Sequence, residues 1–118
     1  MTLWDRARPH DRRAGLFGGR GTVRVWDLAG DPKVAPFSAV LACELEPASS
    51  VGKHVQQRDP EIVIVIEGTG TAHVGGEPQE LRPGAVVELP FGKSLALENG
   101  SDAEPLRYLI VKAHGEAR

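Results

Sequence analysis

Cysteine is nearly absent from the 118 residues, since Cys43 is the single one. A disulfide within the chain is therefore excluded, and a hydrophobic core has to stabilise the fold. The length predicts one domain. Cys43 lies in the apolar run AVLACEL, where we expect a small buried side chain; a reactive thiol is the alternative. The scarcity of cysteine is typical of a reducing compartment and favours a cytoplasmic location.

Long hydrophobic runs are also missing. The longest uninterrupted apolar run, such as the one from Ile62 to Ile66, has five residues, whereas a membrane-spanning helix needs about 20. The chain starts with MTLWDRARPHDRR, which carries several charges and Pro9. A secretory signal peptide has an apolar stretch of roughly 7–15 residues in this place. We therefore expect a soluble protein that is not exported by that route and has no membrane partner.

The sequence also lacks the periodicity of an amphipathic helix. No long window places apolar residues on one face of a helix behind a capping residue. Instead, 14 glycines and 9 prolines separate short runs that are rich in β-branched residues. Such punctuation is typical of strands joined by turns in a sandwich or barrel, so the sequence predicts an all-β fold. The expected strands are 21–28, 37–46, 61–67, 70–74, 85–89, 94–97 and 106–112.

The net charge of −2 is small but unevenly distributed. Six arginines and two aspartates precede residue 25, and the rest of the chain has 8 basic and 14 acidic residues. We define residues 1–20 as the N-terminal basic arm. We expect it to pack on an acidic surface of its own chain or of a neighbouring subunit; binding of RNA or another anion is the alternative. Aromatic residues are not interleaved with the arginines, so no nucleic-acid partner is expected.

Alternation along the strands predicts which side chains share a face. Leu41 and Cys43 share one face of their strand, and Glu44 and Glu46 lie on the opposite face, which we expect to be in water. The segment 62–66, IVIVI, is apolar on both faces, so both need to be covered. We expect a homodimer to provide the second cover; the N-terminal arm of the same chain is the alternative.

Three residues that can bind a metal lie close together in the sequence GKHVQQRDPEIVIVIEG. His54 and Gln56 are two residues apart, so they share a face of an extended strand. Asp59 and Pro60 form a turn signal that lets the next strand fold back and bring Glu61 opposite them. Imidazole, amide and carboxylate groups suit Zn, Fe, Mn or Ni. Taken alone, this pattern also fits three surface residues near a turn.

The same stretch resembles the first conserved motif of the cupin family, G-x5-H-x-H-x(3,4)-E-x6-G. His54 and Glu61 match two of the family's metal ligands, Gln56 stands where the second histidine belongs, and Gly68 matches the last glycine. The spacing is kept, while Pro47-Ala48-Ser49 occupies the place of the usual Pro-Gly-Ala.

The second cupin motif, G-x5-P-x-G-x2-H-x3-N, has a counterpart in GAVVELPFGKSLALEN. Gly84, Pro90, Gly92 and Asn99 are in register, but Leu95 stands in place of the histidine ligand. A leucine cannot coordinate a metal. The resemblance is therefore strong for the fold and partial for the metal site.

The resemblance implies a double-stranded β-helix, or jelly-roll, barrel that encloses a pocket. One domain is expected at 21–118, with the first motif at about 47–68 and the second at about 84–99. Within it, His54, Gln56 and Glu61 are the expected metal ligands. Leu95, Trp26 and Cys43 are expected to line the pocket, although Trp26 also suits a place in the core or at an interface.

Two functions are open at this point. The first is a metal-dependent enzyme for a small organic molecule, of isomerase, cyclase or lyase type, with Glu61 as ligand or general base. A dioxygenase is less favoured, because its iron site needs two histidines and only His54 is in register. The second is a metal-free, non-catalytic cupin that acts as a small-molecule-binding or assembly module. Leu95 and Gln56 favour this alternative.

Overall fold

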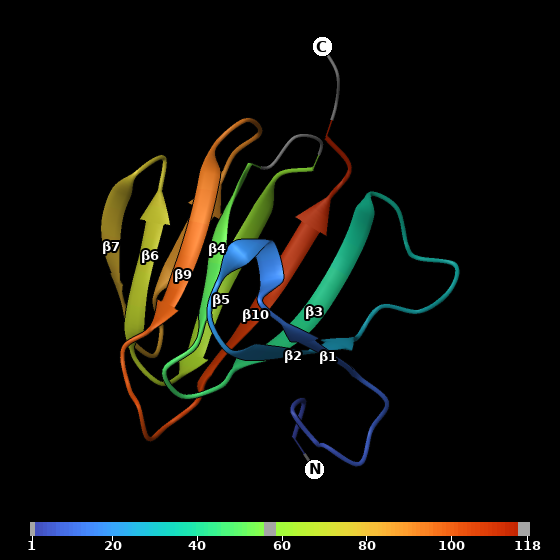
Figure 1. Cartoon of the computed structure of the whole chain (residues 1–118). Coiled ribbons are helices and arrows are strands. Elements are labelled where there is room, and N and C mark those ends of the chain that lie inside the picture. Colours follow the sequence, from blue (N-terminus) through green and yellow to red (C-terminus); the bar gives the residue numbers. More distant parts are fainter. Residues whose placement is uncertain (1, 56–58, 116–118) are drawn as a thin grey trace.

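The computed structural model describes residues 2–55 and 59–115. Its strands form two antiparallel sheets that face each other as the layers of a jelly-roll barrel (Figure 1). The six-stranded sheet contains, in spatial order, β1 (Asp11–Ala14), β2 (Thr22–Asp27), β3 (Phe37–Leu45), β10 (Leu106–Ala113), β5 (Glu61–Glu67) and β8 (Val86–Leu89). The four-stranded sheet contains, in spatial order, β4 (Ser50–Val55), β9 (Ser94–Asn99), β6 (Gly70–Val74) and β7 (Glu77–Leu81).

The predicted all-β jelly roll is confirmed, and every predicted strand is present. Strands β1, β4 and β7 were not in the predicted set. The sequences of β1 and β7, DRRA and EPQEL, are largely polar and exposed and show no apolar alternation. In β4, SVGKHV, apolar residues are few, and only an extended conformation at His54 was considered. No helix among the described residues is long and apolar enough to cross a membrane.

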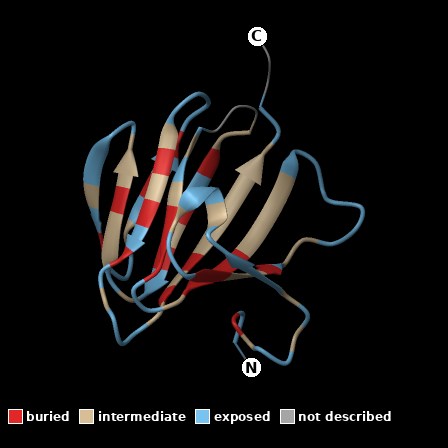
Figure 2. Ribbon diagram, in the orientation of Figure 1, coloured by how far each residue is buried: buried red, intermediate tan, exposed pale blue. Residues whose placement is uncertain are grey.

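The core lies between the two sheets (Figure 2). On β5, Val63 and Val65 point inward and are buried, whereas Ile62, Ile64 and Ile66 point to the outer face. The other buried side chains of this core are Val23, Cys43, Leu45, Val51, Ala72, Leu81, Val87, Leu89, Leu95, Leu97, Leu106 and Tyr108. Apolar burial between the layers is the main force that closes the barrel.

The outer face of β3 differs from the prediction that it lies in water. Glu44 is 0% exposed, because the first residues of the chain cover it. Arg6 and Arg107 each place a guanidinium nitrogen 2.8 Å from one of its carboxylate oxygens. Trp4 packs beside them on Trp26, and its indole nitrogen donates a hydrogen bond to the carbonyl oxygen of Cys43 over 2.8 Å. The arm therefore packs on an acidic group of its own chain.

This cover does not extend to β5. Ile62 and Ile66 remain 41% and 39% exposed, and Val86 of the neighbouring strand β8 is exposed as well. The alternative in which the N-terminal arm covers the outer face of 62–66 is therefore wrong. The first residues of the arm pack on β2 and β3 instead, where Trp4 contacts Trp26.

The later part of the arm is built into the barrel. Asp11–Ala14 form β1, which pairs with β2, and Leu16–Gly18 form a short 3-10 turn, η1, that docks on β4. The docking is close: a Cβ atom added to Gly52 would lie 1.9 Å from the carbonyl oxygen of Phe17. Only glycine fits there, and this contact fixes the position of η1 on β4.

Gly68 and Asn99, which the sequence motifs place outside the ligand set, stabilise the turns and loops of the barrel. Gly68 has a φ of +93°, and a Cβ atom there would lie 2.5 Å from the carbonyl oxygen of Pro105. The side-chain amide of Asn99 donates hydrogen bonds to the carbonyl oxygens of Leu45 and Glu104, over 3.1 and 2.9 Å. These contacts fix the loops that join the two sheets.

Candidate functional site

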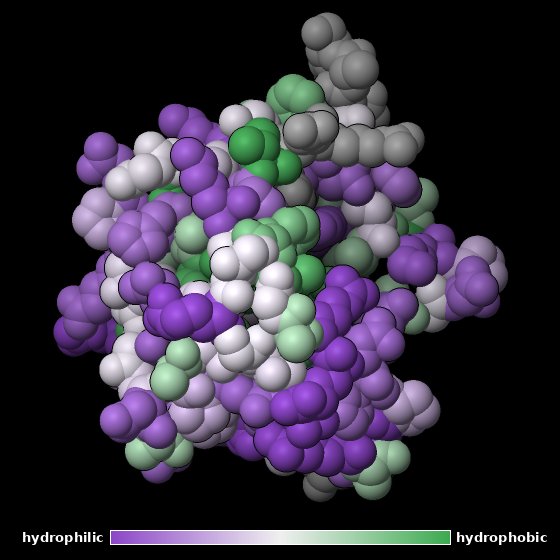
Figure 3. Space-filling model, in the orientation of Figure 1, coloured by the Kyte–Doolittle hydropathy of each residue, from purple (hydrophilic) through white to green (hydrophobic). Residues whose placement is uncertain are grey.

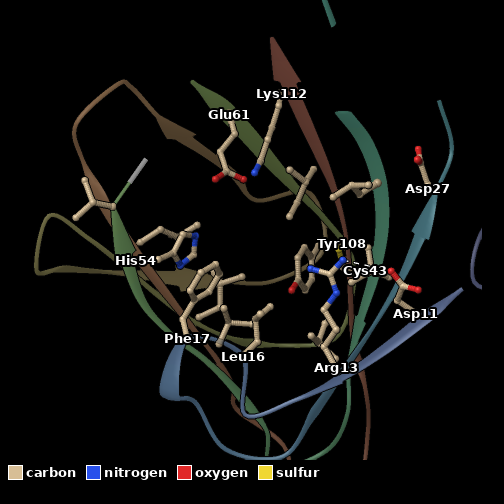
Figure 4. Close-up of a pocket in the computed structure, with 18 residues that line it drawn as sticks. Asp11, Arg13, Leu16, Phe17, Asp27, Cys43, His54, Glu61, Tyr108 and Lys112 are labelled. Atoms are coloured by element: carbon tan, nitrogen blue, oxygen red, sulfur yellow. Dashed lines mark hydrogen bonds and ion pairs between the residues drawn. The ribbon is translucent and has the colours of Figure 1, made fainter. Parts of the chain in front are cut away.

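A cavity of about 340 Å³ opens between the two sheets, next to η1 (Figure 4). Its size is in the range of small-molecule sites. Most of its wall is apolar and includes Leu16, Val23, Val25, Leu41, Val51, Leu97 and Ile110. Besides Asp11 and Asp27, which are exposed and lie near Arg13, its polar side chains gather in two places. We call His54, Glu61 and Lys112 the Glu61 end, and Arg13, Cys43 and Tyr108 the Arg13 end.

His54 reaches the cavity from β4, with its ring stacked on Phe17. Its Nδ1 lies 3.1 Å from the carbonyl oxygen of Gly52. Because a carbonyl oxygen can only accept, Nδ1 carries the proton and donates this hydrogen bond. The lone pair of Nε2 is therefore free for a ligand. This arrangement is common for histidines that bind metals.

Glu61 begins β5 and is 3% exposed. Its Oε1 is buried and has no hydrogen-bond partner within the described part of the chain. Burial raises the pKa of Glu61, and the charge of Lys112, together with that of His54 when its ring is protonated, opposes this rise. A buried polar atom without a partner costs free energy, so Oε1 is suited to meet a bound group.

Lys112 is the cross-strand partner of Glu61. It points inward because it shares the parity of Tyr108 and Ile110 on β10, and its amine lies beside the Glu61 carboxylate in Figure 4. This parity was visible in the sequence, since the strand at 106–112 was predicted. Sequence reasoning nevertheless missed Lys112, because it searched for metal ligands.

Two of the three predicted metal ligands, His54 and Glu61, line the same cavity. The third, Gln56, lies outside the described residues. Leu95, which replaces the missing histidine, is the cross-strand partner of His54 and lines the cavity as expected. Among the described residues, no three His, Cys, Asp or Glu side chains are grouped closely enough to hold a metal ion.

His54 Nε2 and Glu61 Oε1 are nevertheless suited to be two of the ligands of a divalent cation. Both His54 Nε2 and Glu61 Oε1 are without protein partners in the described residues and belong to donor types that such metals accept. A third protein ligand would have to come from Gln56.

At the Arg13 end, Cys43 lines the cavity as expected. Burial raises the pKa of its thiol to about 12, and the nearby Glu61 carboxylate adds to the rise. Burial also raises the pKa of Tyr108. Both groups are therefore neutral at physiological pH, and Cys43 is a thiol and not a thiolate nucleophile.

Trp26 does not line the cavity, so the expectation that it is a pocket wall is corrected. It shares the outward face of β2 with Arg24 and is buried against Trp4 and Ala42. The alternative place in a core cluster is the observed one. The physical reason is parity: Val23 and Val25, the inward residues of β2, line the cavity in its place.

Sequence reasoning also missed Arg13 and Phe17. Both belong to the segment 1–20, which was treated as an arm outside the barrel. The short run DRRA carries no apolar signal, so only its pairing with β2 shows that Arg13 faces the interior.

Comparisons with known proteins agree with this geometry. Residues 41–112 match the cupin domain family. An oxalate-binding protein of Thermotoga maritima is 28% identical over 102 residues, which is 86% of this chain and 84% of that protein.

Solved structures are similar over almost the whole chain. A crystal structure from Thermotoga maritima, described as a predicted oxalate decarboxylase, has a TM-score of 0.87 at 25% identity and covers 98% of this chain and 100% of its own. A cupin 2 conserved barrel protein of Salinispora arenicola has a TM-score of 0.72 at 27% identity, covering 96% of this chain and 87% of its own. Because the family match spans more than half of the sequence, this chain belongs to the cupin family.

Proposed function

We propose that the cavity binds a small organic molecule that carries a carboxylate, and that the carboxylate lies at the Glu61 end. One observation carries the proposal: His54 Nε2 and Glu61 Oε1 both face the cavity without partners among the described residues, next to the amine of Lys112. The amine of Lys112 can donate to a ligand carboxylate on this apolar wall, and His54 Nε2 and Glu61 Oε1 can do so when they carry a proton. The similarity to an oxalate-binding protein supports the same class of ligand.

A divalent metal, Zn, Fe, Mn or Ni, would be held by His54 and Glu61, with Gln56 as the third protein ligand. When bound, such a metal supplies Lewis-acid chemistry to a carbonyl or carboxylate oxygen of the ligand. Glu61 is buried, and its raised pKa suits a group that takes up and releases a proton. An isomerase, cyclase or lyase reaction is the enzymatic form of this proposal.

A metal-free binding module is the second candidate. Leu95 lies opposite His54, and Lys112 brings a positive charge to the Glu61 carboxylate. That charge repels a metal dication and can itself hold a ligand carboxylate. In this form the protein binds its ligand without turnover.

Metal content separates the two candidates. The protein is purified without a tag or chelator, and transition metal is measured per chain before and after incubation with Zn, Mn, Fe(II) or Ni. Near one equivalent, retained in His73→Ala but lost in His54→Ala and reduced in Glu61→Gln, supports the metal site. His73 is the matched control because it is a half-exposed strand histidine outside the cavity lining.

Calorimetry with oxalate and longer carboxylates then tests binding itself. Binding without metal that is weakened by Lys112→Ala supports the second candidate. If no carboxylate binds in the presence or absence of metal, the proposed function is wrong.

We also propose a second copy of this chain as partner. The outer face of β5 and β8 carries an exposed apolar group, Ile62, Ile66 and Val86. A homodimer through this face would cover it.

A further inference from the structure

The cavity has a second polar end that the proposed carboxylate site does not use. We infer that Arg13 binds a second acidic group of the ligand, so that the natural ligand is an elongated dicarboxylate with an apolar middle. This inference rests on the proposed function, because it assigns the ligand class of the same cavity. Oxalate, whose two carboxylates are joined directly, cannot reach both ends.

The position of Arg13 follows from the N-terminal strand. Arg13 pairs with Val23 in the ladder between β1 and β2, and both residues line the cavity. Figure 4 shows the guanidinium group turned from β1 toward Tyr108 and Cys43. The neighbouring Arg12 has the opposite parity, and its Nε lies 3.5 Å from Glu46 on the outer side of the sheet. On β1, Arg13 therefore points toward the cavity and Arg12 points away from it.

Arg13 is only weakly engaged by its own chain. One guanidinium nitrogen lies 3.2 Å from Asp11, in a pair whose side chains are 51% and 69% exposed. An exposed ion pair of this kind contributes little to stability. A guanidinium group has five N–H donors and can bind a carboxylate through two of them. Most of the donors of Arg13 are therefore available to a ligand.

The surroundings of Arg13 consist of buried neutral groups and two exposed acids. Cys43 and Tyr108 are buried and neutral, so they do not compensate its charge. The acids at this end, Asp11 and Asp27, are both exposed, and only Asp11 contacts Arg13. Hydrophilic side chains gather over β1 and β2 in the space-filling view (Figure 3). An incoming acid thus meets a cationic side chain at the rim of an apolar cavity.

The distance between the two ends of the cavity requires a spacer between the two carboxylates of the ligand. Tyr108 marks the Arg13 end and Lys112 the Glu61 end, and both point inward from β10 with Ile110 between them. Four residues of a strand span about 13 Å between Cα atoms. Ile110, Val25 and Leu41 supply apolar wall in the cavity. A ligand that reaches both ends therefore carries several methylene groups between its carboxylates.

Calorimetry with adipate and hexanoate tests this inference, because the two ligands have the same length and differ in the second carboxylate. The wild-type chain is expected to bind adipate about tenfold or more tightly than hexanoate. Arg13→Ala is expected to weaken adipate binding about tenfold and so to remove that preference. Arg12→Ala, the matched control on the same strand, retains the preference for adipate over hexanoate. Arg13→Lys keeps the charge without the bidentate geometry and retains part of the preference.

Each outcome has a defined meaning. An unaltered preference for adipate in Arg13→Ala, or equal binding of both ligands by the wild type, overturns the role of Arg13 and leaves the carboxylate site at the Glu61 end standing. Failure of the wild type to bind adipate and hexanoate while it binds oxalate overturns this inference alone. Failure to bind all three, in the presence and absence of metal, overturns the proposed function as well. Melting curves of Arg13→Ala confirm that the variant is folded, which its exposed position on an edge strand leads us to expect.

Discussion

The ring of Phe17 lies face to face with the imidazole of His54, with ring centroids 4.2 Å apart and 16° between the planes. Phe17 has a φ of 53°, a left-handed conformation that is uncommon for an aromatic residue. The tight docking of η1 on Gly52 holds it there. The N-terminal turn therefore fixes one face of the imidazole, while the hydrogen bond to Gly52 fixes its Nδ1.

Phe17→Ala is expected to weaken ligand or metal binding at His54 by about 2–10-fold, because the ring loses a stacking contact of roughly 0.5–1.5 kcal/mol. The melting temperature should hardly change, since Phe17 is exposed on its other side. Calorimetry on Phe17→Ala and on Phe91→Ala, an exposed phenylalanine outside the cavity lining, checks this. Equal loss in both variants contradicts a specific role for Phe17.

Glu44 is expected to make stability depend on pH. Burial alone would raise its pKa, but hydrogen bonds from Arg107 and Arg6 outweigh this effect and lower the pKa. A lowered pKa in the folded state contributes stability above the pKa of an unfolded glutamate, about 4.3, and this contribution is lost as the pH falls through the folded-state pKa.

Glu44→Gln is therefore expected to reduce the free energy of unfolding by about 1–3 kcal/mol at neutral pH. The difference from wild type should shrink toward low pH. Urea unfolding at pH 7 and at pH 3–4 measures it, with Glu80→Gln as control, because Glu80 pairs with Arg82 on the exposed surface. A difference that stays constant with pH would show that packing, and not charge, is responsible.

Cys43 is expected to resist thiol reagents in the folded protein. Its pKa is raised to about 12 and its side chain is buried. The thiolate is the reactive form, so at pH 8 labelling by iodoacetamide should be about a thousandfold slower than in the unfolded chain. Mass spectrometry of samples with and without urea follows the label. Stoichiometric labelling of the folded protein within minutes would support the alternative that Cys43 is a reactive thiol.

The fold was predictable because short local sequence patterns, repeated along the chain, indicate its strands and turns. The alternation in 39–45 and the glycines and asparagine of the two motifs are sufficient to indicate a cupin barrel. His54, Glu61 and Leu95 could be placed for the same reason. Arg13 and Phe17 could not, because their position depends on β1 pairing with β2 and on η1 docking at Gly52, which are contacts between distant parts of the chain. The burial of Glu44 also depends on a distant partner, since Arg6 precedes it by 38 residues.

The outer face of the six-stranded sheet leads to the last prediction. A row of cross-strand partners, Ala42, Leu109, Ile64 and Val86, crosses this face. Trp4 packs on the Ala42 side of the row, and nothing in the described chain covers Ile62 or Val86. If a second copy covers them, the wild type sediments as a dimer. Ile62→Lys should then shift it to a monomer, because an interface that buries a lysine without a partner is destabilised by several kcal/mol.

Val34→Lys is the matched control, because Val34 is an exposed valine outside β5 and β8 and its replacement should leave the sedimentation unchanged. The melting temperature of Ile62→Lys should become independent of protein concentration, whereas that of the wild type should rise with it. A wild type that sediments as a monomer at all concentrations contradicts the dimer. In that case the isoleucines of β5 are an exposed apolar surface that the isolated chain tolerates, and the covering partner has to be sought elsewhere.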